Sequence, residues 1–325
     1  MRDDWGMEIS DPDEIEEAEI VTRAIPPTRL GPGVHEIPFG VYLADPCEEP
    51  SLRSGDIQRL LTQTPRHFIA NHPRLAPKPP RIDSDRMDLG SIVHKLVLGK
   101  GDDVVLCKFK DWKTQKARDE RDAARAAGKI PTLPKIMAKA ELIAASAIET
   151  LKEEFGEWPF GEMEKTFIWS EQTMTADSDE PVTIWCRTRP DVWCEARALA
   201  IDLKSTEIVL SDDGVEGRLT EEDGRTLVQA AWQLRGATAL HPELAGRITH
   251  CNVFVETKVP YLAAVNDTPS IELQLFDHRC TRAQERYADM LLHPDRTPQR
   301  WPRRRLGVRD WLMKKLMTEE EEALS

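Results

Sequence analysis

Hydrophobic and polar residues alternate in several short segments of the chain, which is the two-residue period of β-strands. In 182–187 the order is Val-Thr-Ile-Trp-Cys-Arg, and 199–202 (Leu-Ala-Ile-Asp) is short and mostly apolar, as in a buried strand. The first of these segments ends at a turn formed by Arg189 and Pro190. Such patterns predict strands over 164–170, 182–187, 191–195, 198–205, 249–258 and 271–277.

Apolar residues three and four positions apart mark the helices. The clearest case is 134–155, where Ala140, Ile143, Ala147 and Leu151 recur at helical spacing. Strands flanked by helices predict an α/β sandwich with a central mixed sheet. A charged, alanine-rich region within about 100–158 predicts a helical lobe over the cleft, or in part a mobile arm. Helices are predicted over 56–64, 86–98, 134–155, 224–240 and 281–292, with a fraying acidic helix over 319–322.

Acidic residues are concentrated at the start of the chain. The 325 residues carry a net charge of −13, and the first twenty hold nine acids against Arg2. We therefore expect an acidic, disordered tail and linker over 1–34, with an interaction arm or a mimic of DNA as alternatives. One large domain is expected over 35–310, because 40% hydrophobic residues suffice for a core, and a C-terminal helix or tail over 311–325.

Composition also excludes several classes of protein. No run of eighteen apolar residues exists and the first residues are acidic, so neither a membrane span nor a signal peptide is expected. The six cysteines contain no Cys-x-x-Cys pair, which argues against structural zinc, a disulfide framework and an iron–sulfur cluster. We expect a cytoplasmic enzyme.

The most informative stretch is 186–206, where Asp191 precedes Asp202 and Lys204 by a short gap. Asp202 and Lys204 are two residues apart on a predicted strand, so both side chains point to the same face. Two converging carboxylates are hard oxygen ligands for Mg²⁺ or Mn²⁺, which can polarise a phosphodiester and generate hydroxide near neutral pH. An ammonium beside them can orient the attacking water or stabilise developing charge.

An aspartate and a lysine on a strand are more often a solvated ion pair than a catalytic centre. Here, Pro190-Asp191 and Asp202-Leu203-Lys204 resemble the PD-(D/E)xK nuclease superfamily, and more narrowly its RecE-type (exonuclease VIII-like) group of phage and prophage exonucleases. The resemblance spans about 40–277. Further segments that carry it are 40–42, 50–56, 64–68, 89–98, 164–169 and 227–233.

The resemblance implies a role for each matching residue. The expected metal ligands are His94, Glu164, Asp191 and Asp202, and Lys204 would position the water. Gln229 would contact metal-bound water or the DNA backbone as part of the catalytic set. Expected DNA contacts are Arg189, Ser205, Thr206, Arg225 and Gln233, the last replacing an aromatic residue common in the family.

Each of these residues also has a plainer interpretation. His94 lies in an apolar-periodic run, where a hydrogen-bonded helix histidine is the default, and Glu164 could be an exposed strand carboxylate. The stripe formed by Arg225, Gln229 and Gln233 could be the wet face of a helix. A basic cluster at Arg296, Arg300, Arg303, Arg304 and Arg305 could contact phosphates or pair with acids.

The resemblance implies a Mg²⁺-dependent exodeoxyribonuclease, with Mn²⁺ able to substitute, that degrades linear double-stranded DNA from 5′ to 3′. It would leave 3′ single strands for a single-strand annealing recombinase. A ring-like homo-oligomer, such as a tetramer, is expected, and an acidic protein can bind DNA in this way because only the channel need be positive. The alternatives are an endonuclease or single-strand-specific nuclease with the same core, and a non-catalytic protein that binds DNA ends.

Overall fold

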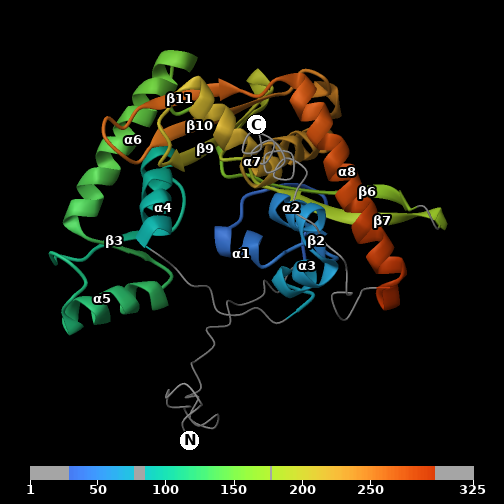
Figure 1. Ribbon diagram of the computed structural model, residues 1–325, viewed down its shortest axis with the longest axis horizontal. Helices are drawn as coiled ribbons and strands as arrows, with labels where there is room; N and C mark the ends of the chain where they lie inside the picture. The colour runs from blue at the N-terminus through green and yellow to red at the C-terminus, as the bar shows by residue number, and fades with distance from the viewer. Residues whose placement is uncertain (1–28, 77–84, 176–177, 297–325) are drawn as a thin grey trace, which may run out of the picture.

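Figure 1 shows the computed structural model, in which residues 29–76, 85–175 and 178–296 are described. It confirms a mixed α/β fold with mixed sheets flanked by helices, and it divides the strands between two sheets. The helices are α1 (Phe39–Leu43), α2 (Ser54–Thr62), α3 (Pro65–Asn71), α4 (Asp85–Leu98), α5 (Gln115–Ala126), α6 (Pro134–Phe155), α7 (Asp212–Leu240) and α8 (Ser270–Leu292).

The five-stranded sheet carries the candidate chemistry. Its order is β11-β10-β9-β8-β5, formed by β5 (Glu162–Met163), β8 (Val192–Cys194), β9 (Leu199–Thr206), β10 (Thr249–Glu256) and β11 (Ala263–Asp267). The neighbouring strands β9 and β10 run parallel, with Asp202 opposite Asn252, and the other pairs are antiparallel. Strand β9 is buried along Leu199–Asp202 and lines a cavity from Asp202 to Ser205.

The four-stranded sheet has the order β1-β6-β7-β2. It consists of β1 (Gly33–His35), β2 (Ser51–Leu52), β6 (Thr166–Thr175) and β7 (Ser178–Thr188), with β2 parallel to β7. A separate parallel pair, β3 (Val104–Leu106) and β4 (Ile130–Thr132), brackets α5 and forms the lobe at the lower left of Figure 1.

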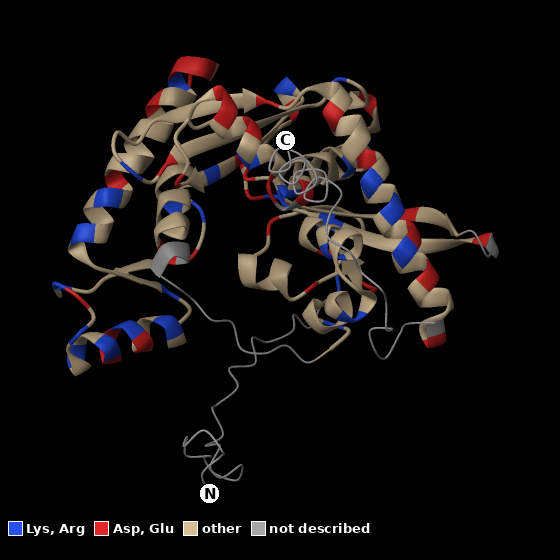
Figure 2. Ribbon diagram, viewed as in Figure 1, with Lys and Arg blue, Asp and Glu red and all other residues tan. Residues whose placement is uncertain are grey.

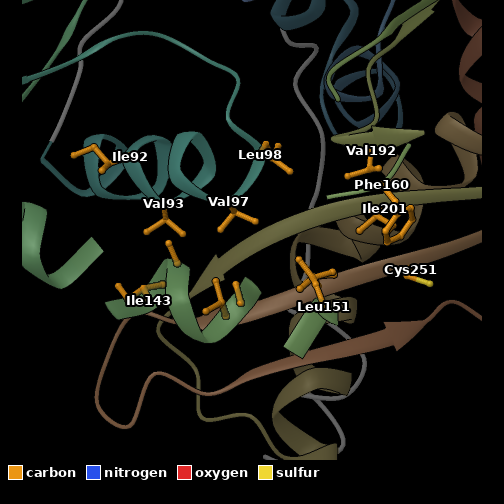
Figure 3. Close-up of a cluster of buried hydrophobic side chains, with 14 of the residues drawn as sticks. Ile92, Val93, Val97, Leu98, Ile143, Leu151, Phe160, Val192, Ile201 and Cys251 are labelled. Carbon is orange, nitrogen blue, oxygen red and sulfur yellow. The ribbon is translucent and has the colours of Figure 1, made fainter. Parts of the chain in front are cut away.

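Two hydrophobic cores hold these layers together. In the first, α4 and α6 cover the five-stranded sheet, and Val93 and Ile143 belong to the same extended cluster as Ile201 and Cys251 (Figure 3). In the second, α7 and α8 cover the four-stranded sheet and α2 packs on both of them. Trp169 packs on Trp232 with ring centroids 5.1 Å apart.

Helix α7 packs against both sheets. Ala237 joins a small core with Phe167 of β6 and Ala200 of β9. The approach is close, because a Cβ added at Gly236 would lie 2.7 Å from the Trp169 ring. Helix α7 therefore connects the two halves of the molecule.

Several sequence expectations are corrected. The segment 271–277 is part of α8 rather than a strand, β11 was not expected, and α7 begins twelve residues before the predicted start at Gly224. The linker expected up to Val34 already contains β1, which pairs with β6. The tail at 1–28, the acidic helix at 319–322 and the last part of the basic cluster, from Arg300 on, lie outside the described residues.

Candidate active site

A cavity of about 570 Å³ opens where α4, β9 and α7 meet the loop before β8. Its wall is completed by the start of α2, by α1 and by the end of α5. Most of the side chains expected at the site line it together, although they come from four separate regions of the sequence: His94, Glu164, Arg189, Asp191, Asp202, Lys204, Ser205 and Gln229.

Asp191 lies in the loop that connects the two sheets, between β7 and β8. Its Oδ2 accepts a 2.6 Å hydrogen bond from the backbone N–H of Leu203 on β9. Its Oδ1 lies 2.9 Å from Nε2 of His94. One oxygen of this carboxylate is thus held by the sheet while the other faces a cationic partner.

Glu164 lies between β5 and β6, not on the strand where the sequence placed it. Its φ of 54° is left-handed, which costs a residue with a Cβ about 1–2 kcal/mol and directs its side chain toward the cavity. Its backbone N–H donates to the carbonyl of Asp191 at 2.9 Å. Oε2 accepts from Arg189 at 2.5 Å, and Oε1 lies 3.4 Å from Nδ1 of His94.

Arg189, expected to contact DNA, lines the cavity and is held there by protein groups. Besides Glu164, it donates to the carbonyl of Ile37 at 2.8 Å and lies 5.8 Å from the centre of the Phe39 ring. With its donors directed to these groups, Arg189 positions the Glu164 carboxylate.

Asp202 is only 2% exposed and is surrounded by donors. Its Oδ1 accepts from the side-chain amides of Gln229 at 2.6 Å and Gln233 at 2.9 Å, and its Oδ2 contacts the ammonium of Lys204. Burial opposes ionisation, but the Lys204 ammonium, with the Gln233 amide, outweighs it and lowers the pKa of Asp202. This carboxylate therefore remains ionised without bulk water.

The three carboxylates share one arrangement. Each has one oxygen held by a fixed donor: a backbone N–H for Asp191, Arg189 for Glu164, and two amides for Asp202. Each turns its second oxygen toward a cationic side chain in the cavity, His94 or Lys204. Carboxylates that are oriented but balanced by movable cations can exchange those cations for a metal ion.

His94 is placed between two of these carboxylates. Burial alone would lower its pKa, but Asp191, Glu164 and Asp202 together raise the pKa to about 9. The imidazolium thus occupies a position of strongly negative potential. A histidine in this environment can serve as a ligand only after it loses its proton.

A buried chain of hydrogen bonds continues behind Asp202. Gln233, whose amide donates to Asp202, accepts through Oε1 from Nε2 of His250 at 2.8 Å. Nδ1 of His250 lies 3.4 Å from Oγ1 of Thr268. The amide orientation of Gln233 requires His250 to carry its proton on Nε2, and burial lowers the pKa of His250 to about 4, so the imidazole stays neutral.

Three expected DNA contacts are not part of the cavity. Gln233 is 1% exposed, and its amide donates to Asp202. Thr206 is buried, and its hydroxyl accepts from the N–H of Ile208 at 3.2 Å. Arg225 is exposed on α7 but does not line the cavity. Ser205 lines it, and Gln229 lines it with its amide engaged by Asp202 and Lys204, so Gln229 is a positioning residue.

Sequence reasoning missed His250 and part of the cavity wall. His250 is a lone histidine in a strand, and the only signal for it was the glutamine at 233 that replaces an aromatic residue. Asp88 lines the cavity from α4, and Arg125 and Lys129 line it from the lobe. Their distance along the sequence from Asp202 concealed them. A separate group, Glu195 with His241 and Glu243, lies outside the cavity, and both of its glutamates are exposed.

No helix in the described part of the chain is both long and apolar enough to cross a membrane. No family model matches the sequence. No curated protein matches it either.

Solved structures that are similar to this chain include two exonucleases. One is a candidate exonuclease from Eubacterium rectale, with a TM-score of 0.46 and 11% identity over 79% of this chain and 91% of that one. The other is a phage-related exonuclease from Haemophilus somnus 129PT, with a TM-score of 0.29 and 10% identity over 75% of this chain and 96% of that one.

Proposed function

We propose that the protein is a metal-dependent deoxyribonuclease that hydrolyses phosphodiester bonds in the cavity around Asp202. The observation that carries the proposal is the set of three oriented carboxylates that face His94 and Lys204. A purely structural ion pair has no need for three acids that converge on one cavity, each with one oxygen fixed.

The donor set fits a hard divalent ion such as Mg²⁺ or Mn²⁺. Asp191, Asp202 and Glu164 would hold it, with His94 as a further ligand once deprotonated. Asp202 retains a lone pair for this purpose, since Oδ1 accepts two bonds and Oδ2 contacts only Lys204 in the described residues. When bound, the ion supplies polarisation of the phosphate oxygens and a hydroxide near neutral pH.

Lys204 and Gln229 position the groups that would act on the phosphate. Two of the three ammonium donors of Lys204 are directed to Asp202 and to Oε1 of Gln229, at 2.7 Å for the latter. The third is left for a water molecule or a phosphate oxygen. Gln229 bridges Asp202 and Lys204, so the carboxylate and the ammonium keep their relative positions as the substrate charge changes.

The finer proposal is a 5′ to 3′ exonuclease on linear duplex DNA, with 3′ single strands as its product. It is supported by the ordered motifs that resemble RecE-type exonucleases, in which Asp191, Asp202 and Lys204 match the core. A ring-like homo-oligomer around the DNA and a single-strand annealing recombinase as partner belong to the same proposal.

The test is digestion of 5′-labelled linear duplex beside closed-circular DNA, with Mg²⁺, Mn²⁺ or EDTA. We expect metal-dependent loss of the linear label with the circle intact. Lys204→Ala should lower the rate by about 10²–10³-fold, the magnitude found for a donor at a developing charge. Lys258→Ala is the matched control, because that lysine is exposed and pairs with Glu207 on the surface.

The other outcomes separate the alternatives. Cleavage of the circle would indicate an endonuclease, and a preference for single strands would indicate a single-strand-specific enzyme with the same centre. No cleavage of any substrate with either metal would overturn the catalytic proposal and favour a protein that binds DNA ends.

A further inference from the structure

A row of basic side chains runs along one face of α5 toward the cavity. Arg118, Arg121 and Arg125 are three and four residues apart, so they project within about 60° of one another around the helix axis. Arg125 and Lys129, which follows the end of the helix, line the cavity itself. We call Arg118, Arg121, Arg125 and Lys129 the α5 basic row.

The other faces of α5 have different roles. Ala117 and Ala124 are buried against the lobe, and Asp119 and Glu120 follow on the side away from the row. One acid, Asp122, lies beside the row and pairs with Arg121.

The lobe has the opposite charge to the chain as a whole. Residues 108–129 contain eight Lys and Arg against four Asp and Glu, a net of +4, whereas the whole chain has −13. Figure 2 shows α5 in the lobe at the lower left, with basic and acidic segments alternating along it. Exposed lysines at 108, 110, 113, 116 and 129 add to the local positive potential.

Arg125 of the row is held by an ion pair with Asp88 of α4 at 2.7 Å, whereas Arg118 and Arg121 have local partners on α5. Arg118 donates to the carbonyl of Lys113 at 2.8 Å and to Oε1 of Gln115 at 3.0 Å. Arg121 pairs with its neighbour Asp122 at 2.8 Å, and its guanidinium carbon lies 6.0 Å from the centre of the Trp112 ring. Surface pairs of this kind contribute at most about 1 kcal/mol, so a phosphate can replace them.

We infer that the α5 basic row binds the phosphates of one DNA strand and guides that strand into the cavity. The inference rests on the proposed function, because it takes the same DNA as the ligand. Arg118 and Arg125 are separated by about 10 Å of helix, which is the rise of about three nucleotides. The row thus matches a short run of backbone and ends beside the carboxylates.

The test measures binding without cleavage. Fluorescence anisotropy of a labelled duplex of about 30 base pairs is recorded in EDTA over a range of salt concentrations. Arg118→Gln/Arg121→Gln should weaken binding at least about tenfold and reduce the slope of log K against log salt by about 2. Arg118→Lys/Arg121→Lys, which keeps both charges, should retain the slope.

The control variant is Arg247→Gln/Arg282→Gln, which removes the same charge from exposed arginines before β10 and on α8. It should leave the slope unchanged. Equal slopes for the row variant and the wild type would overturn the inference, as would an equal loss in the control. Neither result depends on hydrolysis, so a wild type that binds DNA but never cleaves it would remove the proposed function and leave this inference standing.

Discussion

The side-chain amide of Gln233 donates to Asp202 while its oxygen accepts from His250, so a neutral histidine outside the cavity fixes the direction of a carboxylate inside it. We expect Gln233→Leu to break both bonds. The variant should lose about 1–3 kcal/mol of unfolding free energy because His250 is left unpaired, and kcat should fall about 10–100-fold.

The measurement is kcat and KM on linear duplex, together with urea unfolding. Gln172→Leu is the control, since Gln172 donates to Thr183 at 2.9 Å on an exposed part of the four-stranded sheet. An unchanged kcat in Gln233→Leu would show that Asp202 keeps its orientation without the hydrogen bonds through Gln233 and His250.

The stability of the metal-free protein should depend on the pH through His250. Its pKa is about 4 in the folded state against 6.5 for the free side chain, so the unfolded chain binds more protons between these values. Stability therefore falls as the pH drops from about 6.5 toward 4, by about 3 kcal/mol in full. Urea unfolding of the wild type and His250→Gln at several pH values checks this, since the difference between them should shrink or reverse on acidification.

Metal binding should release a proton from His94. Because its pKa is raised to about 9, His94 is protonated at pH 7.5 in the metal-free protein and must become neutral to serve as a ligand. Titration calorimetry with Mn²⁺ in two buffers of different ionisation enthalpy should give about one proton per ion. His94→Gln should bind more weakly and release none. If the wild type releases none, His94 stays a proton donor to Asp191.

The pair of Arg189 and Glu164 should act through metal affinity and not through DNA contact. Arg189→Met leaves the Glu164 carboxylate without its main partner, which should cost about 3 kcal/mol of stability. Adding Glu164→Gln should recover part of this loss, as a double-mutant cycle by urea unfolding can measure. DNA binding in EDTA should be unchanged, and a clear loss there would restore the expected DNA contact.

Local chemistry made parts of the fold predictable. The helix expected over 134–155 has those bounds in the structure, because Pro134 begins it and Gly156 ends it with a φ of 78°. The buried strand before Asp202 was likewise found from its apolar run. Asp202 and Lys204 lie on one face because a two-residue spacing on a strand leaves no other arrangement.

Other parts depended on tertiary contacts. Ile271, Leu273 and Leu275 alternate as in a strand, but they belong to α8. Of these three residues, only Leu273 is buried. The predicted start of α7 at Gly224 falls where Asp223 and Gly224 have φ values of 58° and 77°, an interruption within the longer helix. The chain of hydrogen bonds from Asp202 through Gln233 to His250 could not be predicted, because these residues lie on three elements that are distant in sequence.

Because α7 is fixed between both sheets and also supplies Gln229 and Gln233 to Asp202, the centre has little freedom to open separately from the molecule. Amide hydrogens in the middle of this helix should exchange with solvent at the rate of global unfolding. Heat inactivation and loss of tertiary structure should then occur in one transition. A substitution that loosens either core should therefore also lower the activity.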